Sequence, residues 1–384
     1  MKADVLVQKI KELGIQTVTG VPDSTLKLFC DYMNNDGRDV IEDHIVTSNE
    51  GAAIGIAIGE YLSTGNPACV YMQNSGLGNA VNPVTSLANT DVYGIPMLMV
   101  IGWRGEPGTK DEPQHEYMGK VTLPMLRLLD IAYGIMGPET TEEELAGFLR
   151  CAGNAFAENR QYALVIRRGT FEKKEEGIYR NRYSMDREMA VGMIVGWLQP
   201  DSLVVSTTGK ISREAYEQSN AVLGKHNQIF LTVGGMGHAS MIAYQLARRK
   251  TGQRVICLDG DGAVLMHMGS LAVMGRHPAS NLVHVCLNNE AHESVGGMPT
   301  GAGGTSYADI ARKCGYGNVY RVATKEGLGK ALGEIRGLKE MTFLEVNVAI
   351  GSRKDLGRPA ETARENKAAF MEYAGQAGKT GRDT

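Results

Sequence analysis

The sequence has no excess of basic residues: 40 lysines and arginines stand against 43 aspartates and glutamates, for a net charge of −3 at pH 7. The basic residues are scattered rather than gathered in a stripe, which is not the charge pattern of a nucleic-acid-binding protein. No uninterrupted apolar run approaches the ~20 residues that a membrane-spanning helix needs. The start, MKADVLVQKIKELGIQTVTG, has neither a long apolar core nor a small-residue cleavage site, so we expect no secretory signal. We therefore expect neither a nucleic-acid partner nor a membrane partner.

Cysteine is sparse and shows no metal-binding spacing. The six cysteines, at positions 30, 69, 151, 257, 286 and 314, form no Cys-x-x-Cys pair. Cys257 and Cys286 lie inside apolar runs that we predict to be buried strands. This placement is typical of packed thiols in a reducing compartment, and it predicts a cytoplasmic protein without a disulfide framework.

Apolar runs separated by helical segments do fill the chain, in two halves. At 384 residues the chain exceeds the roughly 150 residues of a typical domain, which favours two domains. We predict a fold of the α/β class with two doubly wound parallel-sheet domains, at residues 1–170 and 187–350. A charged linker at 171–186 joins them, and residues 351–384 form a partly ordered extension. The predicted strands are 16–21, 40–46, 68–73, 97–103, 131–136 and 162–168 in the first half, and 203–208, 229–233, 254–258, 281–287, 319–322 and 342–348 in the second. The equal element counts indicate a structural duplication, although no sequence repeat is visible.

Residues 254–297 are the most informative stretch. One apolar run there ends in Gly-Asp-Gly at 260–262, and a second ends in Asn-Asn at 288–289. We predict that the two runs are neighbouring parallel strands, connected by one helix over residues 263–276. Their carboxyl ends would then lie side by side, at the edge where open α/β sheets bind ligands.

Oxygen atoms and backbone N–H groups meet at this edge. Asp261 offers a carboxylate and Asn289 an amide oxygen, which together with loop carbonyls form the kind of site that Mg²⁺ occupies while it also contacts phosphates. Gly260, Gly262 and Ala263 would offer backbone N–H groups to an anion at the start of the helix.

Gly-Asp-Gly by itself is also typical of a tight turn without a ligand. Followed by a helix, a strand and Asn-Asn, it closely resembles the thiamine diphosphate motif. The two halves resemble the pyrimidine-binding (PYR) and diphosphate-binding (PP) domains of thiamine diphosphate-dependent 2-oxoacid decarboxylases, over nearly the whole chain. Larger members insert a middle domain, for which the linker at 171–186 leaves no room. The resemblance implies a two-domain enzyme with thiamine diphosphate and Mg²⁺ as cofactors.

Glu50 precedes the helical segment GAAIGIAIGEYL. Thr47 with Glu50 three residues later has the form of a capping box, which would give Glu50 a purely structural role. In the family, however, the matching glutamate contacts N1′ of the cofactor's pyrimidine and promotes its activation. The resemblance therefore implies that Glu50 is catalytic. Glycines 51, 55 and 59 would give this helix a flat face for close packing at a domain or subunit boundary.

Three further side chains are candidate proton donors. Asp23 resembles a catalytic aspartate of the family, although it is equally suited to cap the next helix. His115 lies in a loop rich in Gly and Pro, where several family members carry a His-His pair and this chain has one histidine; a surface histidine is the alternative. The resemblance implies that His292, Glu293 and Ser294 point toward the thiazolium and the substrate, in a loop that ordinary polar caps explain nearly as well.

Further cofactor contacts are predicted in the second domain. Thr208 and Gly209 end a predicted strand with a hydroxyl and a glycine, which suits contact with the diphosphate, with a strand-end turn as the alternative. The resemblance assigns two more contacts. Met236, isolated among glycines, would hold the cofactor in its bent form, and the Gly234 carbonyl would accept from its amino group; packing in the core is the default role of a methionine. The carbonyl of Ala291 would be the third protein ligand to Mg²⁺.

For the two-domain form, the resemblance implies decarboxylation of 3-phosphonopyruvate to phosphonoacetaldehyde and CO₂, in phosphonate biosynthesis. Sulfopyruvate carries one charge less on a similar frame, and the sequence does not separate the two substrates. A dianionic phosphonate requires cations or grouped N–H donors. The candidate substrate ligands are Ser24, Asn74, Ser75, Arg104 and Lys110. Exposure on a solvated surface explains the two cations, Arg104 and Lys110, equally well.

Two other functions stay open on the sequence. A non-catalytic thiamine diphosphate-binding module would not need an acid at Glu50, and a carboligase usually brings the middle domain that is absent here. The resemblance also implies self-association into at least a dimer, in which Glu50 of one subunit meets Asp261 and Asn289 of another.

Overall fold

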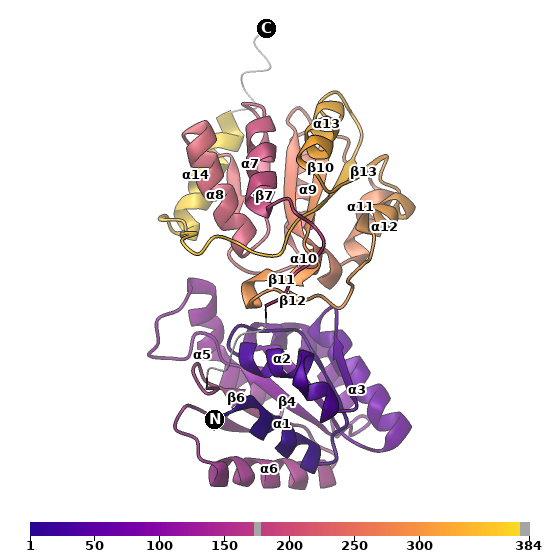
Figure 1. Cartoon of the computed structure of the whole chain (residues 1–384), viewed down its shortest axis with the longest axis vertical. Helices are drawn as coiled ribbons and strands as arrows, with labels where there is room; N and C mark the ends of the chain where they lie inside the picture. Colours follow the sequence, from indigo (N-terminus) through magenta and orange to yellow (C-terminus); the bar gives the residue numbers. More distant parts are fainter. Residues whose placement is uncertain (173–177, 377–384) are drawn as a thin grey trace. The chain divides into compact units, whose positions relative to one another are not determined.

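The computed structural model describes residues 1–172 and 178–376. Residues 173–177 of the predicted linker and residues 377–384 of the predicted extension lie outside the described residues. The chain divides into two compact units, Met1–Ile178 and Tyr179–Thr384, each built on a six-stranded sheet (Figure 1). In the part of the chain that the structure describes, no helix is both long and apolar enough to cross a bilayer.

The sheet of the first unit has the order β2-β1-β3-β4-β6-β5, and all its pairs are parallel. Its central strands β3 and β4 are apolar and almost entirely buried, as expected of parallel strands covered on both faces. The strands are β1 (Thr17–Gly20), β2 (Asp43–Val46), β3 (Ala68–Gln73), β4 (Met97–Gly102), β5 (Ala132–Met136) and β6 (Tyr162–Ile166).

Helices cover both faces of this sheet. Ala53 of α3, Leu77 of α4 and Leu126 of α5 belong to one apolar cluster on the first face. On the other face, Phe29 of α2 contacts the ring of Tyr71, and α1 lies against α2 and α6 (Figure 1). The helices are α1 (Ala3–Glu12), α2 (Lys27–Asn34), α3 (Glu50–Thr64), α4 (Leu77–Pro83), α5 (Pro113–Leu128) and α6 (Glu142–Ala157), with short turns η1 (Asp36–Asp39), η2 (Asn74–Gly76) and η3 (Val84–Ala88).

The second unit repeats this architecture with the order β13-β14-β10-β9-β7-β8, again with parallel pairs throughout. Cys257 on β9 and Cys286 on β10 are buried free thiols, as predicted. The strands are β7 (Leu203–Ser206), β8 (Ile229–Leu231), β9 (Val255–Gly260), β10 (Leu282–Asn288), β13 (Asn318–Val322) and β14 (Thr342–Asn347), beside a small hairpin of β11 (Ala291–His292) and β12 (Met298–Pro299).

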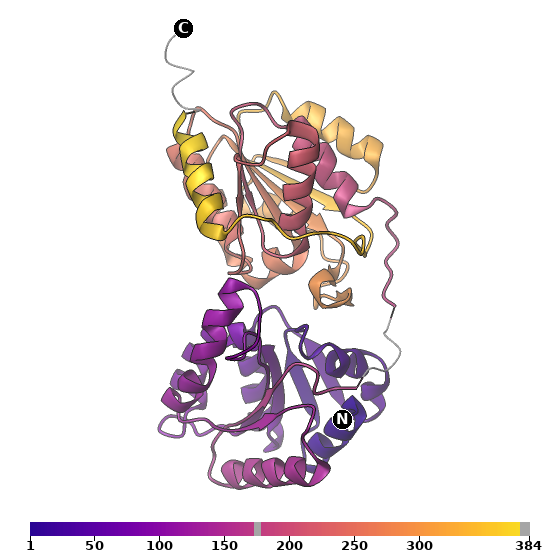
Figure 2. The ribbon, with the colours of Figure 1, turned by 90° about the vertical axis from the view of Figure 1, so that its left-hand side faces the viewer.

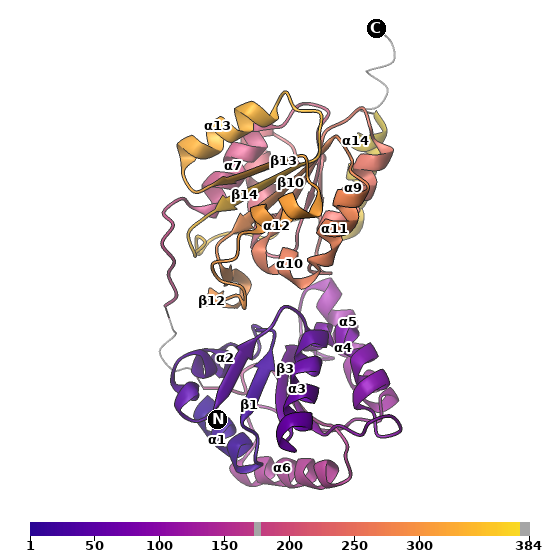
Figure 3. The ribbon, with the colours of Figure 1, turned by 90° about the vertical axis from the view of Figure 1, so that its right-hand side faces the viewer.

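Two apolar clusters lie on the two faces of this sheet. One joins it to α7, α8 and α13, and the other joins it to α9, α11, α12 and α14. Figure 3 shows α11 and α12 on one side of β10 and β13, with α7 and α13 on the other. The helices are α7 (Arg187–Trp197), α8 (Lys210–Leu223), α9 (Ala239–Arg249), α10 (Asp261–Met266), α11 (Gly269–Arg276), α12 (Tyr307–Cys314), α13 (Lys325–Ile335) and α14 (Ala363–Gln376), with a turn η4 (Glu293–Val295).

Both sheets have the same topology. Numbered in chain order within its unit, each sheet runs 2-1-3-4-6-5, which confirms the predicted duplication. In this order the chain first moves to one side of the first strand and then to the other. The crevice between the first and third strands is therefore the topological switch point, where open α/β sheets bind ligands. It lies between β1 and β3 in the first unit and between β7 and β9 in the second.

The single helix predicted over residues 263–276 is wrong. Two helices occupy this stretch, because His267 leaves the helical backbone with φ −131° and ψ 44°. Its imidazole lies against the loop before α9, where a Cβ on Gly237 would come 2.5 Å from its Cδ2 atom. The first of these helices also begins at Asp261, earlier than predicted, so Asp261 occupies its first turn.

The segment after residue 351 contains α14, which covers an edge of the second sheet (Figure 2, yellow). Phe370 and Tyr373 of this helix are buried in an apolar cluster of the unit. Asn366 accepts from the N–H of Leu231 at 3.0 Å and donates to the carbonyl of Ile229 at 2.9 Å. The Asn366 side chain thus satisfies backbone groups of the edge strand β8 that a neighbouring strand would otherwise satisfy.

Candidate functional site

In the second unit, the switch point places two glycine loops beside each other. Thr207 N–H donates to a carbonyl of β9 at 2.7 Å, which holds the loop after β7 against that strand. Gly209 has φ 96° and ψ −143°, a conformation that essentially only glycine adopts. Gly260 lies opposite, because a Cβ on it would come 3.3 Å from Ile211 Cδ1 of α8. No side chain among the described residues caps α8, so its first N–H groups are available to an anion near Thr208.

Asp261 lies in the first turn of α10 and is 3% exposed. Its carboxylate accepts from the backbone N–H groups of Gly262 and Asn289, and the Thr300 hydroxyl donates to Oδ2 at 3.4 Å. Burial raises the pKa of this carboxyl to about 7, and the hydrogen bonds oppose that shift. A buried carboxylate that is costly to ionise is stabilised by a cation, so Asp261 fits a metal ligand.

Asn289 and Ala291 follow β10, the strand next to β9. The N–H of Ala291 donates to Oδ1 of Asn289 at 3.2 Å, and Ala291 pairs with Pro299 in the small hairpin. Glu290 between them has φ 60°, which turns the chain sharply. Together with the bond from Asn289 to Asp261, these contacts bring the three predicted metal ligands into one place.

Met236 and His292 both lie beside Gly262. A Cβ on Gly262 would come 3.1 Å from Cε of Met236 and 3.5 Å from the imidazole of His292. The loop of Met236 also lies against α10, because a Cβ on Gly237 would come 3.0 Å from the carbonyl oxygen of Ala263. The structure therefore joins the loop after β8 to the Gly-Asp-Gly turn, as the predicted cofactor contacts require.

His292 is an uncharged candidate. Burial lowers the pKa of its imidazole to about 4, so it is neutral at neutral pH. Its Nε2 has no hydrogen-bond partner within the described ranges. An uncharged imidazole with a free nitrogen can exchange hydrogen bonds with a bound molecule but does not carry a permanent positive charge.

Gly234 is half-buried in the loop that also carries Met236.

Glu293 differs from the side chains with which it was grouped. The resemblance implied that it points toward the substrate with His292 and Ser294. Its carboxylate instead accepts from Nδ2 of Asn289 and from the N–H of Gly351, both at 2.9 Å. Glu293 thus contacts the turn that carries the predicted metal ligand Asn289.

Glu50 begins α3 in the first unit and is 5% exposed. The capping box with Thr47 is wrong: Asn49 is the N-cap, and its side chain accepts from the N–H of Ala52 at 2.9 Å. Because Asn49 performs the capping, the Glu50 carboxylate is free of that role. It accepts instead from Nδ2 of Asn79 at 2.7 Å, in a buried position.

Gly76 lies directly against the carboxylate of Glu50, since a Cβ on Gly76 would come 2.3 Å from Oε1 of Glu50. Gly76→Ala is expected to push the carboxylate away from Asn79 and to lower kcat by about tenfold or more. Gly78→Ala, two residues on, is the control, because a Cβ on Gly78 meets nothing described within 4 Å. Steady-state kinetics of the two variants test this, and equal kcat values would contradict the placement.

Asp23 follows β1 at the switch point of the first unit and is 1% exposed. Nε2 of Gln73, at the end of β3, donates to Oδ1 of Asp23 at 2.5 Å. Oδ2 accepts from the N–H groups of Thr25 at 2.8 Å and Leu26 at 3.3 Å, so Asp23 also organises the turn before α2. Burial raises the pKa of Asp23, and the bond from Gln73 and the charge of Arg104 oppose that shift.

Gln73→Leu is expected to raise the pKa of Asp23 further, because the amide donor that favours the carboxylate is lost. The limb of the pH–kcat profile that reports Asp23 should move to higher pH. Gln8→Leu makes the same change at an exposed position of α1 and should leave the profile in place. An unshifted profile in Gln73→Leu would exclude Asp23 from the proton transfers that limit kcat.

Arg104 follows β4 and is held in one orientation. Its Nε and Nη2 bond the carboxylate of Asp111 at 2.7 and 2.5 Å, and Nη1 donates to Oγ of Ser24 at 3.0 Å. The structure therefore brings the candidates Ser24 and Arg104 together near Asp23, whose carboxylate senses the guanidinium charge. Asp111 neutralises much of that charge, so Arg104 presents an oriented dipole rather than a bare cation.

The remaining substrate candidates divide into exposed and buried side chains. Ser75 and Lys110 are exposed, and Ser75 donates to Oε1 of Gln73 at 2.7 Å. Asn74 is fully buried: Nδ2 donates to the Arg104 carbonyl and to Thr122, and Oδ1 accepts the Arg104 N–H. These bonds use both amide hydrogens, so Asn74 positions the Arg104 backbone and has no donor left for a substrate.

His115 lies in the first turn of α5, not in the loop where the sequence placed it. The start of that helix packs against Gly105, where a Cβ would come 1.9 Å from the His115 carbonyl oxygen. Burial lowers the pKa of His115, and the charge of Arg104 adds to that shift. The histidine thus stands in the same charged cluster as Asp23, Arg104 and Asp111.

The side chains that hold these groups were not among the predicted site residues. Asn79 fixes Glu50, Gln73 fixes Asp23, and Asp111 fixes Arg104. Gln73 ends a predicted strand, and Asn79 follows six residues later in α4. Polar residues beyond that strand end were the available signal.

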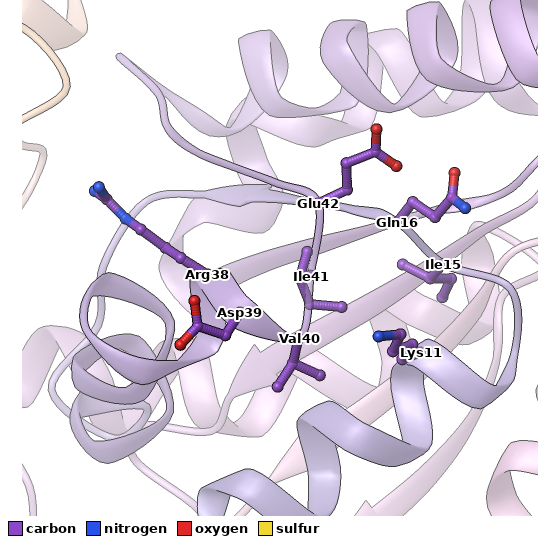
Figure 4. Close-up of a pocket in the computed structure, with 8 residues that line it drawn as sticks. All are labelled: Lys11, Ile15, Gln16, Arg38, Asp39, Val40, Ile41 and Glu42. Carbon is purple, nitrogen blue, oxygen red and sulfur yellow. The ribbon is translucent and has the colours of Figure 1, made fainter.

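A cavity of about 300 Å³ in the first unit lies away from these residues (Figure 4). It is lined by the end of α1 and by residues 38–42, before the amino ends of β1 and β2. Lys11, Arg38 and Glu42 around it are exposed. Ligands of open parallel sheets bind at the opposite, carboxyl ends, so this cavity is not part of the candidate site.

Comparison with known proteins agrees with the geometry. The family model "Thiamine pyrophosphate enzyme, N-terminal TPP binding domain" matches residues 2–123, and the model of the C-terminal TPP binding domain matches residues 207–346. A phosphonopyruvate decarboxylase of Streptomyces viridochromogenes is 35% identical, over 96% of this chain and 94% of its own length. One of Streptomyces hygroscopicus is 33% identical, over 97% and 94%. A sulfopyruvate decarboxylase of Methanosarcina acetivorans is 28% identical, over 90% and 91%.

Two parallel sheets of identical topology, each with its acidic and glycine-rich turns at the switch point, thus define a thiamine pyrophosphate enzyme with its N-terminal and C-terminal cofactor-binding domains. Within that class, the chain belongs to the family of the phosphonopyruvate and sulfopyruvate decarboxylases. The family predicted from the sequence is confirmed.

Proposed function

We propose that the protein is a thiamine diphosphate- and Mg²⁺-dependent carbon–carbon lyase that decarboxylates 3-phosphonopyruvate to phosphonoacetaldehyde. The observation that carries the proposal is the joined Asp261–Asn289 pair at the carboxyl ends of β9 and β10. It occurs in a chain that is 35% identical to a phosphonopyruvate decarboxylase over nearly the whole length of both.

The chemistry of the donors in the second unit fits both cofactors. Asp261, Asn289 and the carbonyl of Ala291 supply the oxygen ligands that Mg²⁺ prefers. Thr208, Gly209 and the N–H of Ala263 would bind the diphosphate at two helix starts. Gly260 and Gly262 would allow its close approach, since their own N–H groups donate to Asp259 and Asp261. Met236 would support the cofactor from below, with the Gly234 carbonyl as an acceptor for its amino group. Thiamine diphosphate, when bound, supplies the electron sink for breaking the bond to the departing carboxylate.

In the first unit, two of the proposed acids, Glu50 and Asp23, are held by neighbouring side chains. Glu50, oriented by Asn79, would exchange a proton with N1′ of the pyrimidine. Asp23, with its raised pKa, and His115 would deliver a proton to the product, and His292 of the second unit would act as a neutral hydrogen-bonding group.

For the substrate, we propose that Arg104, with Ser24, orients the phosphonate, and that the exposed Ser75 and Lys110 assist. The fixed guanidinium suits a tetrahedral oxyanion, since its N–H groups are already aligned by Asp111.

We propose self-association with active sites at the subunit interface, where Glu50 of one subunit would serve Asp261 and Asn289 of another. Gly55 and Gly59 leave one face of α3 open, with no described atom within 4 Å of a Cβ on either. Leu62 on this helix is 73% exposed, an apolar surface suited to burial by a second copy. We place the enzyme in the cytoplasm, where its free buried thiols would stay reduced, and in phosphonate biosynthesis.

Release of CO₂ from phosphonopyruvate, sulfopyruvate and pyruvate, each with and without thiamine diphosphate and Mg²⁺, tests the proposal. We expect the highest kcat/KM for phosphonopyruvate and no turnover without both cofactors. Faster turnover of sulfopyruvate would replace the substrate. Failure of all three with cofactor demonstrably bound would favour a carboligase or a binding module.

A further inference from the structure

Glu293 lies at the centre of a charged cluster beside the proposed metal site. Its carboxylate is 13% exposed and accepts from the side chain of Asn289 and the N–H of Gly351. Nη1 of Arg187 lies 3.5 Å from Oε2, and Nζ of Lys210 lies 3.4 Å from Oε1. Both carboxylate oxygens of Glu293 therefore have a donor or a cation beside them.

The two cations of the cluster are themselves fixed. Arg187 is 3% exposed and makes a bidentate pair with Glu214, at 2.9 and 2.7 Å. Burial works against its charge, but the bonds and charges of Glu214 and Glu293 outweigh burial and raise the pKa of Arg187. Nζ of Lys210 donates to Oγ of Ser352 at 2.5 Å. Neither cation can leave Glu293 without breaking a second interaction.

The cluster fixes the orientation of the Asn289 side-chain amide, and so determines whether Oδ1 or Nδ2 faces the proposed metal site. A carboxylate accepts hydrogen bonds and cannot donate them, so Glu293 holds the amide nitrogen of Asn289 on its own side. Oδ1 must then face away from Glu293, where the N–H of Ala291 already approaches it. Outer carboxylates that orient a metal ligand in this way commonly strengthen metal binding.

The other end of the cluster lies next to the loop after β7, where we propose that the diphosphate binds. Lys210 is the first residue of α8 and directly follows Thr208 and Gly209. One chain of contacts therefore runs from the start of α8, through Lys210 and Glu293, to Asn289.

We infer that Glu293, held by Arg187 and Lys210, is a positioning residue that couples divalent-cation binding at Asn289 to diphosphate binding at the start of α8. A cation at Asn289 would fix Glu293 and, through it, Lys210 beside the diphosphate. Diphosphate at the start of α8 would fix Lys210 and, through Glu293, Asn289. Each ligand therefore raises the affinity for the other. The inference rests on the proposed cofactor site. Its test measures binding alone, so it does not depend on which oxoacid is the substrate.

The test is calorimetric titration of the full chain with thiamine diphosphate, with and without Mg²⁺. The ratio of the two dissociation constants measures the coupling. Relative to wild type, Glu293→Gln and Lys210→Met should lower this ratio by about tenfold, the scale on which outer ligands act. Loss of the Lys210 charge weakens diphosphate binding in both titrations, and the ratio cancels that effect. Asp309→Asn, which removes an exposed carboxylate paired with Arg312 outside the cluster, should leave the ratio unchanged.

Ratios in both variants within about twofold of wild type would overturn the inference, because the normal scale of such effects is larger. If Glu293→Gln does not fold by circular dichroism, Lys210→Met, which keeps the Arg187–Glu293 and Asn289–Glu293 contacts, decides alone. Wild type that binds no thiamine diphosphate with Mg²⁺ would overturn the proposed cofactor site and the coupling together, an outcome distinct from binding with unaltered ratios.

Discussion

Glu50→Gln is expected to lower kcat by about 100-fold or more, while thiamine diphosphate binds within about threefold of the wild-type affinity. Glutamine keeps the size of the side chain, but its amide cannot exchange a proton with the pyrimidine as a carboxyl can. The buried Glu50 carboxylate has Asn79 as its hydrogen-bond partner and no capping role, so the substitution removes chemistry rather than structure. The measurements are steady-state CO₂ release and calorimetric binding.

Glu60→Gln is the matched control for this variant. Glu60 lies on the same helix, where its carboxylate contacts Thr64 near the far end. The Glu60→Gln variant should retain the wild-type kcat and the wild-type affinity for thiamine diphosphate. Wild-type turnover in Glu50→Gln would remove the acid from the mechanism and favour a binding module.

Asp261→Asn is expected to weaken Mg²⁺ binding by at least about 100-fold, beyond the effect typical of losing an outer partner. The variant loses the anionic oxygen of the proposed metal site. Its amide nitrogen also replaces a carboxylate oxygen where Asp261 now accepts hydrogen bonds from backbone N–H groups. Binding of thiamine diphosphate should weaken with the metal, since a divalent cation held at Asp261 would stabilise the charge of the diphosphate. Electron spin resonance of Mn²⁺, used in place of Mg²⁺, measures the loss directly.

The exposed Asp309→Asn serves here as well, because it removes the same charge from the same unit. Its Mn²⁺ titration should overlay that of wild type. If Asp261→Asn binds Mn²⁺ as wild type does, the cation binds elsewhere and the assignment of Asn289 and Ala291 fails with it.

The strands of the two sheets were the part of the fold most easily predicted from the sequence. Parallel strands buried on both faces must be apolar along their length, and the glycines and polar residues at their ends give the positions of the loops. For this reason the strands at 68–73 and 342–348 correspond closely to β3 and β14. The order of the strands in the two sheets could not be predicted in the same way, because strand pairing depends on contacts between segments that are distant in the sequence.

Errors arose where neighbouring residues compete for one role. Thr47 and Asn49 are both good N-caps, and only the backbone decides that Asn49 is used. Residues 263–276 have helical composition throughout, but the helix breaks at His267, which packs against the distant Gly237. Local sequence carries no trace of that contact.

The cofactor motif was predictable, and its supports were not. Asp261 and Asn289 lie at the ends of adjacent strands, so their residue types and spacing predict a metal site, which remains a proposal. Glu293 receives Lys210 from 83 positions away, and Arg187 lies farther still along the chain. Ion pairs at such separations leave no pattern in one sequence, and they emerge only when the fold is known.

The most direct test of the account is ³¹P nuclear magnetic resonance of the protein incubated with phosphonopyruvate. With thiamine diphosphate and Mg²⁺ present, the phosphonopyruvate signal should be replaced by that of phosphonoacetaldehyde. It should persist when either cofactor is omitted, and Glu50→Gln should replace it at least about 100-fold more slowly. An unchanged phosphonopyruvate signal from protein with both cofactors bound would contradict the proposed function.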